Sequence, residues 1–486
     1  MYDILIIGAG VVGCAVARKL SQYQARIAVL EAAEDVADRA SKANSGIVHA
    51  GFDARPGTKK AYYNVKGAGM YASLAREMNV PYDPNGALVL GFHEEDRAVL
   101  EKLLRQGVEN GVKQLQILEK HQVLSLEPNV NPAVTCALYA PTSAVVSPYE
   151  MTIALAYHAA QNGVEFRFDT PVTALQKEED HWHVTTTRGD FQARAVINCA
   201  GVGAAKLHNL ISDREVTIIP RRGEYYLLDH TVKCPFRHTM FQVPSKMGKG
   251  VLITPTAHGN ALLGPSAEDI EDGLDTATTR YGLDFVLDKC RLTWPGVNIR
   301  PVITTFSGVR AHPVSDDFII GPVSGAPEGA FEAIGIESPG LTAAPAIAEE
   351  LGDTVARFLK LEINGNFIPP QPLLKPFAAM SDPERAAACR RNPDYGRIVC
   401  RCEVVTEAEI RDAIRRPVGA RSIDAVKRRT RAGMGRCQGG FCSPRVMEIL
   451  CEELHVSPLD ITKSGGESRL LVGTLADIAK EAQNRE

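Results

Sequence analysis

Four cysteines near the carboxyl end of the chain are spaced in a way that suits metal binding. Cys400 and Cys402 form one close pair, and Cys437 and Cys442 form a second pair. Thiolates in two such pairs can hold a metal from tight turns, and zinc is one candidate. Zinc sites usually separate paired cysteines by about two to four residues. The one-residue gap in the first pair therefore favours two irons bridged by sulfide, with one iron on each pair. The alternative is a set of structural thiols or disulfides.

Three glycines near the amino end, Gly8, Gly10 and Gly13, have the spacing GxGxxG. They follow the apolar run 4–7, which predicts a buried parallel strand, and they open a predicted helix. In this fingerprint the first glycine makes a tight turn, the second lets the backbone approach a pyrophosphate, and the third lets the helix lie close to the strand. Glu31 follows by about 20 residues, where a carboxylate can accept hydrogen bonds from ribose hydroxyls. These features predict a site for FAD or NAD, with an ordinary glycine-rich turn as the alternative.

Two further side chains could act on a substrate. His49 lies in the small-residue stretch 41–53, whose short side chains would let the backbone approach a flat cofactor. His49 could be a general base or a packed histidine behind the site. Arg310 lies between small neighbours, and its guanidinium could grip a carboxylate or phosphate through two hydrogen bonds. The alternative for Arg310 is a structural ion pair with Asp316 or Asp317.

Strand and helix patterns indicate how these residues are positioned. Residues 59–125 read as helical, with helices predicted over 61–78 and 94–111. Residues 163–201 alternate like a β-meander and then give a buried strand that ends at Ala200 and Gly201. This layout is typical of FAD-binding oxidoreductases and not of plain NAD dehydrogenases.

The second half of the chain predicts a different kind of sheet. Strand patterns dominate residues 216–318 and favour an antiparallel sheet that forms a substrate domain. Residues 338–342 open a helix that continues to Phe358, and its amino end could face a flavin ring, which carries negative charge when reduced. The proline-rich segment 366–377 predicts an extended linker and the clearest domain boundary.

Length and composition limit the classes of function. With 486 residues the chain can bury two or three cores. A formal charge of −4 gives no general reason to expect a nucleic-acid partner. Met1 runs directly into a strand pattern, so we expect no signal peptide. No apolar stretch reaches the roughly 18 residues of a transmembrane helix. We therefore expect a cytoplasmic protein, with membrane association only through a partner.

These stretches together resemble the D-amino-acid-oxidase-like FAD oxidoreductases, and within them the anaerobic glycerol-3-phosphate dehydrogenases and L-2-hydroxyglutarate dehydrogenases. The tail 400–442 is similar to the bacterioferritin-associated-ferredoxin-like 2Fe-2S domain that is fused to several such dehydrogenases. The resemblance covers nearly the whole chain. The segments that carry it are 8–13, 44–51, 222–225, 254–256, 264–265, 307–310 and 335–342.

The resemblance implies an α/β fold with a Rossmann-like FAD-binding domain, an antiparallel-sheet substrate domain and a small helical 2Fe-2S domain. We expect the FAD-binding domain at 1–75, 140–210 and 305–362, the substrate domain at 76–139 and 211–304, a linker at 363–392 and the 2Fe-2S domain at 393–486. By position, His49 becomes a flavin-face or proton-accepting residue, Arg310 the anion clamp, and Cys400, Cys402, Cys437 and Cys442 the cluster ligands. The residues expected to contact FAD are Gly8, Gly10, Gly13, Glu31, Asn44, Ser45, Gly46, Ala200, Gly201, Gly340, Leu341 and Thr342.

The expected activity follows from the two cofactors. FAD takes two electrons and the cluster carries one at a time, which implies stepwise delivery to another redox centre. We therefore expect a dehydrogenase that acts on a small anionic substrate and passes electrons to partner subunits. Glycerol 3-phosphate is the first candidate, a 2-hydroxy acid such as L-2-hydroxyglutarate the second, and an amine or imino acid the third. The motif 307–311 leans toward the hydroxyacid branch, whereas the cluster domain leans toward glycerol 3-phosphate. The alternative of another class is a non-catalytic electron-transfer subunit.

Overall fold

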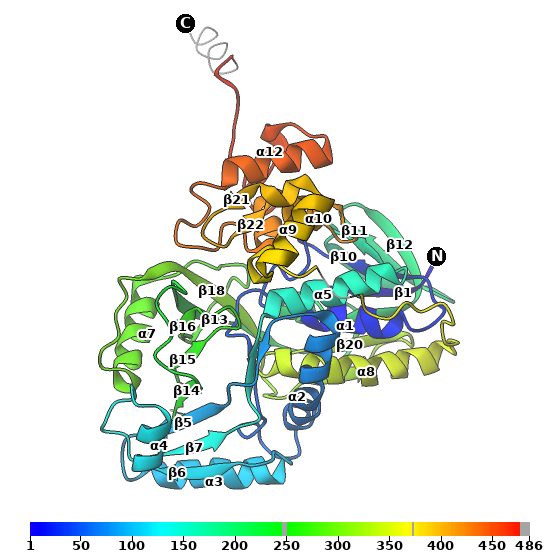
Figure 1. Cartoon of the computed structure of the whole chain (residues 1–486). Coiled ribbons are helices and arrows are strands. Elements are labelled where there is room, and N and C mark those ends of the chain that lie inside the picture. The colour runs from blue at the N-terminus through cyan, green and yellow to red at the C-terminus, as the bar shows by residue number, and fades with distance from the viewer. Residues whose placement is uncertain (245–249, 372–373, 477–486) are drawn as a thin grey trace, which may run out of the picture. The chain divides into compact units, whose positions relative to one another are not determined.

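The structure, a computed structural model, describes residues 1–244, 250–371 and 374–476 and divides into two compact units (Figure 1). The first unit comprises residues 1–32 and 36–373, and the second comprises residues 33–35 and 374–486. Parts of the predicted substrate domain, linker and 2Fe-2S domain lie outside the described residues, at 245–249, 372–373 and 477–486 respectively.

An eight-stranded sheet organises the dinucleotide-binding part of the first unit. Strand β1 (Tyr2–Ile7) lies at its centre, parallel to β2 (Ile27–Leu30) on one side and to β12 (Gly189–Asn198) on the other. Continuous apolar runs form β1 and β2 because both faces of these strands are buried. The other strands are β9 (Glu165–Arg167), β10 (Val172–Lys177), β11 (Trp182–Thr186), β19 (Ile319–Pro322) and β20 (Ala330–Ile334).

Helices cover this sheet and connect its strands. Helix α1 (Val11–Leu20) packs against α5 (Pro148–Gln161) and α8 (Gly340–Leu359), and α2 (Lys59–Met78) also packs against α8 (Figure 1). A shorter helix, α6 (Ala204–Ile211), follows β12. The predicted helices over 61–78 and 340–358 are thus confirmed. Three short strands, β3 (Ile47–Val48), β4 (Tyr82–Asp83) and β8 (Ala144–Val146), form a separate small sheet.

A nine-stranded sheet forms the other part of the first unit. Its longest strands, β13 (Ile218–Leu228) and β18 (Val302–Pro313), pair antiparallel along their length. The remaining strands are β5 (Ala87–Gly91), β6 (Gln116–Glu119), β7 (Cys136–Ala140), β14 (Thr239–Gln242), β15 (Leu252–Pro255), β16 (Ala261–Gly264) and β17 (Glu268–Asp269). The predicted antiparallel sheet is confirmed, apart from one parallel pairing between β5 and β14.

Several elements differ from the sequence prediction. Strands β4, β5 and β6 interrupt the stretch 59–125 that reads as helical, which also contains α3 (Asp96–Glu109) and α4 (Lys120–Leu126). Helix α7 (Arg280–Thr293) interrupts the stretch in which strand patterns dominate. Strand β5 is a short apolar segment inside the nine-stranded sheet, and α7 is an amphipathic helix that buries one face against that sheet. Tertiary packing, and not local pattern, decides such segments.

The second unit is mainly helical, as predicted. It contains α9 (Asp382–Arg391), α10 (Glu407–Arg415), α11 (Ile423–Thr430) and α12 (Ser443–Leu454), with a small hairpin of β21 (Ile398–Cys400) and β22 (Val405–Thr406). An apolar core between α10, α11 and α12 includes two of the four clustered cysteines, Cys400 and Cys442.

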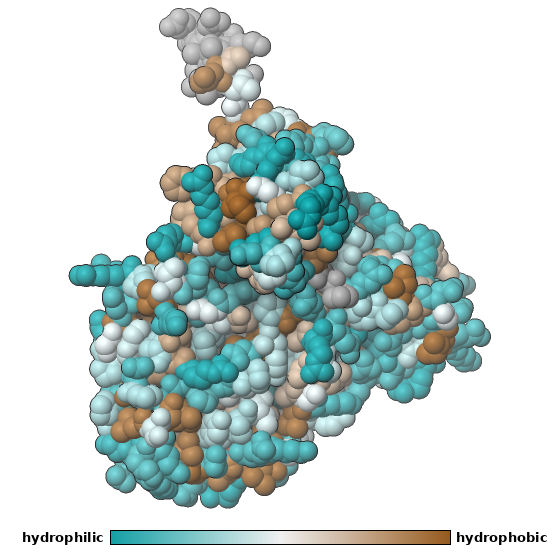
Figure 2. All heavy atoms as spheres, viewed as in Figure 1, coloured by the Kyte–Doolittle hydropathy of each residue, from teal (hydrophilic) through white to brown (hydrophobic). Residues whose placement is uncertain are grey.

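The surface carries mostly hydrophilic side chains on the face shown in Figure 2, with apolar ones scattered in small groups. Among the described residues, every helix is too short or too polar to cross a lipid bilayer.

Candidate functional site

The carboxyl ends of β1, β2 and β12 meet at one edge of the eight-stranded sheet. At the end of β1, Gly8 has a φ of +102°, and a Cβ there would lie 2.5 Å from the carbonyl oxygen of Cys199. A Cβ on Gly13 would lie 1.9 Å from the carbonyl oxygen of Gly8. Only glycine fits both positions, so the strand, the turn and α1 are packed as closely as a dinucleotide loop requires.

The start of α1 presents hydrogen-bond donors and acceptors at this loop. The Val11 N–H donates to Ser41 Oγ at 2.8 Å, and the Ala9 N–H donates to Glu31 Oε2 at 2.6 Å. Gly10, which precedes the helix, has only that serine hydroxyl near its missing Cβ, at 3.2 Å. Free N–H groups at a helix start favour an anion, and a carboxylate at the end of β2 suits ribose hydroxyls. The glycine cradle at the start of α1 and the carboxylate at the end of β2 fit the diphosphate and ribose of FAD.

Ala200 and Gly201 extend the same edge from β12. Gly201 is exposed and has a φ of +57°. The Asn198 side chain holds this turn, because its Oδ1 accepts from the Ala200 N–H and its Nδ2 donates to the carbonyl of Ala204. Five of the residues predicted to contact FAD, Gly8, Gly10, Glu31, Ala200 and Gly201, therefore lie where β1, β2 and β12 end, and Gly13 lies in the first turn of α1.

A second group forms where the small-residue stretch meets the start of α8. Asn44 Oδ1 accepts from the Gly46 N–H at 2.8 Å, and Gly46 has a φ of +66°. A Cβ on Gly46 would lie 2.5 Å from the carbonyl oxygen of Val146, so the turn is held tightly. Ser45 lies between them, and its hydroxyl hydrogen bonds with the buried Tyr225.

His49 is half-buried. Its backbone contacts the first turn of α8, and its ring contacts the segment just before α8. Its backbone N–H donates to Thr342 Oγ1 at 3.0 Å, and that hydroxyl donates to the carbonyl of Ile47 at 3.3 Å. Its Nε2 lies 3.4 Å from Ser338 Oγ. Because α8 begins at Gly340, the first N–H groups of the helix, those of Gly340, Leu341 and Thr342, lie beside the same stretch.

Arg310 lies on β18, half-buried, and donates from Nη2 to the carbonyl of Ser266 at 2.9 Å. The two carboxylates considered as structural partners are engaged elsewhere. Asp316 Oδ1 accepts from Lys60 Nζ at 3.0 Å, and Asp317 accepts backbone N–H groups at the start of α2. Within the described ranges, Arg310 forms no ion pair, so part of its guanidinium fork can receive an anion.

Strand β18 runs back to the small-residue stretch. A Cβ on Gly308 would lie 1.9 Å from the carbonyl oxygen of Ala43, so the two backbones are in direct contact. On the neighbouring strand, Tyr225 stacks on Phe306 with 4.8 Å between ring centroids. Burial raises the pKa of Tyr225, while the positive charge of Arg310 and the Ser45 hydrogen bond partly offset that shift. Arg310 and the stretch 43–46 thus belong to one neighbourhood.

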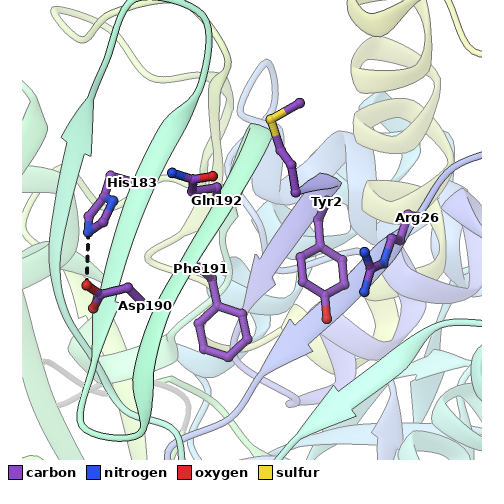
Figure 3. A pocket seen from close by; sticks show the side chains of 7 residues that line it. Tyr2, Arg26, His183, Asp190, Phe191 and Gln192 are labelled. Carbon is purple, nitrogen blue, oxygen red and sulfur yellow. Dashed lines mark ion pairs between the residues drawn. The ribbon is translucent and has the colours of Figure 1, made fainter.

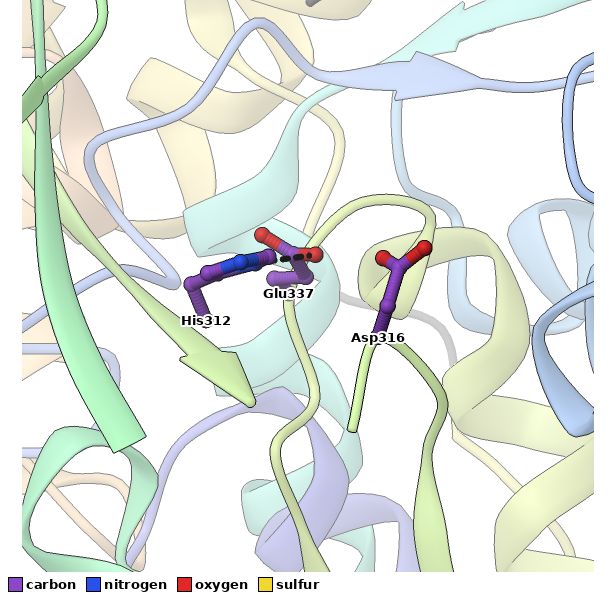
Figure 4. Close-up of side chains that lie close together, drawn as sticks. All are labelled: His312, Asp316 and Glu337. Atoms are coloured by element: carbon purple, nitrogen blue, oxygen red, sulfur yellow. Dashed lines mark hydrogen bonds and ion pairs between the residues drawn. The ribbon is translucent and has the colours of Figure 1, made fainter. Parts of the chain in front are cut away.

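A charged cluster forms around His312, which lies two residues after Arg310 on β18. His312 Nδ1 contacts Glu337 Oε1 at 2.9 Å, and Asp316 lies nearby (Figure 4). These three side chains could offer ligand atoms to a metal, but Lys60 Nζ already bonds Glu337 Oε1 at 2.8 Å and Asp316 Oδ1 at 3.0 Å. Burial alone would raise the pKa of Glu337, yet Lys60 and His312 more than offset it, so the pKa lies below its usual value. The ammonium group of Lys60 therefore occupies the position that a metal ion would take between these side chains.

A surface hollow of about 290 Å³ lies away from both groups. It is lined by Tyr2, Arg26, His183, Asp190 and Phe191, and Arg26 lies over the Tyr2 ring at 4.4 Å (Figure 3). Tyr2 begins β1, so the hollow lies at the amino end of that strand. Ligands of open α/β sheets bind at the carboxyl ends. The hollow is therefore not part of the site.

The four clustered cysteines of the second unit converge. None of the eleven cysteines is in a disulfide, and Cys402 Sγ lies 3.9 Å from Cys437 Sγ. A hydrogen bond from Cys442, with backbone N–H groups of Gly433, Glu403 and Cys402, lowers the pKa of Cys400 to about 6 despite burial. Burial alone would raise the pKa of Cys437, but the N–H groups of Phe441 and Gly439 lower it. N–H groups turned toward sulfur thus favour the thiolate at Cys400 and Cys437. Burial raises the pKa of Cys402, and the hydrogen bond to Cys400 raises the pKa of Cys442. The convergence of four thiols from two close pairs is what fits a thiolate-bound cluster.

Comparison with known proteins identifies the family of each part of the chain. The family described as FAD dependent oxidoreductase matches residues 3–354. The chain belongs to this family. A second family, the BFD-like [2Fe-2S] binding domain, matches residues 398–452, which include all four cysteines. FAD and a 2Fe-2S cluster are therefore the cofactors, as the sequence predicts, and the zinc alternative is not supported.

Relatives match over different lengths. The glycerol 3-phosphate dehydrogenase of Caloramator mitchellensis is 46% identical over 474 residues, which cover 97% of this chain and 98% of the relative. The glycerol 3-phosphate oxidase of Mycoplasma pneumoniae is 34% identical over 364 residues, which cover 72% of this chain and 93% of the relative. A solved structure of dithionite-reduced L-alpha-glycerophosphate oxidase from Mycoplasma pneumoniae with FAD bound has a TM-score of 0.72 and 31% identity, and covers 77% of this chain and 99% of its own.

Sequence reasoning missed several side chains around this site. Ser41 begins the small-residue stretch, and its hydroxyl position at the start of α1 could have been inferred only from the fold. Tyr225 and Ser338 lie within segments 222–225 and 335–342, which carry the family resemblance, but the sequence predicts no role for either side chain. The ion cluster of Lys60 and Glu337 has no local signal, because its members lie 277 positions apart.

Proposed function

We propose that this chain oxidises glycerol 3-phosphate by hydride transfer to FAD and passes the electrons through its 2Fe-2S cluster to an electron-accepting protein. The observation that carries the proposal is the length of the match to the Caloramator dehydrogenase. That match covers 97% of the chain and so extends through the cluster domain, whereas the match to the Mycoplasma oxidase covers 72%. An oxidase delivers electrons to oxygen without a cluster, but a dehydrogenase with a one-electron carrier needs a protein acceptor.

The substrate's anionic end is assigned to Arg310. A planar guanidinium fork suits phosphate oxygens because it donates two parallel hydrogen bonds. One Nη2 bond to Ser266 fixes the orientation of the fork while leaving other N–H groups for the ligand. Because Gly308 brings β18 into contact with the backbone at Ala43, a phosphate held by Arg310 would place the rest of a three-carbon substrate toward the small-residue stretch.

His49 is assigned to accept the proton of the substrate hydroxyl. FAD, when bound, supplies the acceptor for the hydride that leaves the carbon bearing this hydroxyl. The backbone bond to Thr342 and the Nε2 contact with Ser338 hold the imidazole beside the start of α8. The helix start offers N–H groups that favour negative charge in this region. A histidine fixed in this way can act as a general base toward the substrate hydroxyl.

The test is an anaerobic substrate screen that is read at the flavin absorption. Glycerol 3-phosphate should bleach the flavin, while glycerol, which lacks the anion for Arg310, should not do so at the same concentration. L-2-Hydroxyglutarate and small amino acids serve as competing candidates. Bleaching by L-2-hydroxyglutarate and not by glycerol 3-phosphate would move the assignment to the hydroxyacid branch. No bleaching by any of them would favour the electron-transfer subunit.

A further inference from the structure

The second unit exposes an aromatic side chain next to its cluster ligands. Phe441 directly precedes Cys442, and 90% of its surface is accessible. Because Phe441 is adjacent to the ligand Cys442, which is buried, its exposed ring lies in solvent beside the cysteine site. Single exposed apolar side chains are common on protein surfaces, so what distinguishes Phe441 is its position next to Cys442 together with the charges beside it.

Exposed positive charge flanks this ring. Arg401 lies between Cys400 and Cys402, Arg436 directly precedes Cys437, and both arginines are exposed. The two ligand loops are segments 400–403 and 436–442. Glu403 is their acidic residue, but it is mostly buried and accepts from Arg431 Nε at 2.8 Å. Among the described residues of segments 400–403 and 436–442, the exposed charged side chains are Arg401 and Arg436. The exposed surface at the ligand loops is therefore aromatic and basic.

We propose that Phe441, Arg401 and Arg436 form the docking surface for a one-electron acceptor protein that presents an acidic face around its own redox centre. The inference rests on the proposed function only in that the cluster donates electrons to a protein. Each docking event moves one electron, so two acceptor molecules are reduced and the cluster is oxidised twice for each substrate that loses a hydride and a proton. Aromatic and arginine side chains are the residues that most often contribute large shares of the binding free energy at protein interfaces. Opposite charges on the two partners increase the rate at which they associate.

A different role for the same arginines is to compensate the negative charge of the cluster. That role and docking predict different measurements. Charge compensation would change the midpoint potential and the EPR spectrum of the cluster, and it would act equally on all acceptors. Docking would change the affinity for an acidic acceptor and its dependence on salt, because exposed charges are screened by ions. Phe441 carries no charge, so its effect would be confined to docking.

The experiment measures binding of the full-length holoprotein, oxidised and without substrate, to two haem proteins of opposite charge. The acidic haem domain of cytochrome b5 is the probe, and basic cytochrome c is its counterpart. Wild-type affinity for the acidic probe should fall as salt rises. Phe441→Ala and the double variant Arg401→Gln with Arg436→Gln should each weaken it by about tenfold. Affinity for cytochrome c should not weaken in the arginine variant.

Matched controls and contrary outcomes keep the test decisive. Arg421→Gln removes an exposed arginine of the second unit outside the ligand loops, and Leu475→Ala removes an apolar side chain that is 86% exposed. Both should bind like wild type. Unchanged probe affinity in the loop variants, or equal losses with both haem proteins, would overturn the proposal. Wild-type affinity that does not respond to salt would also overturn it, even where a variant loses its cluster. Because no substrate is present, failure of the substrate screen leaves this result interpretable.

Discussion

The flavin site and the cysteine site are assembled by the chain in opposite ways. In the first unit, the bond between His49 and Thr342 joins residues that are 293 positions apart, and Gly308 meets Ala43 across a similar separation. In the second unit, all four thiols come from two loops between Cys400 and Cys442. A site built from local spacing can lose one ligand and leave its surroundings intact. A site built from long-range contacts depends on how closely its elements approach one another.

The largest expected effect is on the local site. Cys437→Ser replaces a soft thiolate with a hydroxyl that is a poor ligand for the cluster. The cluster EPR signal and electron delivery to protein acceptors should disappear. Bleaching of the flavin by substrate should remain, because the glycine loop and Arg310 belong to the first unit. Metal analysis of wild type should find iron and no zinc.

Cys451→Ser is the matched control, since Cys451 lies on α12 outside the two ligand loops. It should keep the EPR signal and acceptor reduction. If Cys437→Ser protein also fails to bind FAD, the two sites are not independent in the way that the comparison requires.

The second effect tests the anion clamp of the long-range site. Arg310→Lys keeps the charge but replaces a planar fork with a point charge, so the phosphate should be held less firmly and aligned less well. We expect KM for glycerol 3-phosphate to rise by about 10-fold to 100-fold, and kcat also to fall. Steady-state kinetics with an artificial electron acceptor that reacts at the flavin would measure both.

Arg221→Lys provides the control for this substitution. Arg221 lies opposite Arg310 in the strand register but is bonded to Asp269 from both Nε and Nη2. Its replacement should change KM by less than about threefold, because an exposed ion pair contributes little. Unaltered kinetics in Arg310→Lys with FAD still bound would return Arg310 to a structural role.

The same contrast explains what the sequence could predict. The cysteine spacing and the GxGxxG run are local patterns with a direct chemical meaning, so the cofactors and the overall fold follow from them. Contacts between distant segments have no such pattern. Ser41 at the start of α1, and Lys60 between Glu337 and Asp316, become evident only once the sheet and helices are assembled. Strand β5 and helix α7 are missed for the same reason, since packing against distant strands decides their conformation.

The smallest effect concerns the close approach of α2 to α8 in the first unit. A Cβ on Gly67 would lie 2.0 Å from the carbonyl oxygen of Thr342, whereas a Cβ on Gly69 would meet no atom of the described residues within 4 Å. Both glycines lie in α2, where alanine is intrinsically favoured by up to about 1 kcal/mol. For Gly67→Ala the contact with the backbone outweighs this gain, because α8 must move, and overpacking costs about 2 kcal/mol.

Movement of α8 would displace its first turn, where the Thr342 hydroxyl accepts from the His49 N–H. The contact between Gly67 and Thr342, which are more than 270 positions apart, should therefore affect cofactor binding. We expect Gly67→Ala to weaken FAD binding by about tenfold and to lower the temperature at which flavin fluorescence is released. Gly69→Ala should leave FAD affinity unchanged and raise that temperature slightly. The cluster EPR signal should be the same in both variants, since the substitutions lie in the first unit. Equal behaviour of the two variants would show that the start of α8 tolerates displacement, and that the flavin site is less dependent on long-range packing than the comparison holds.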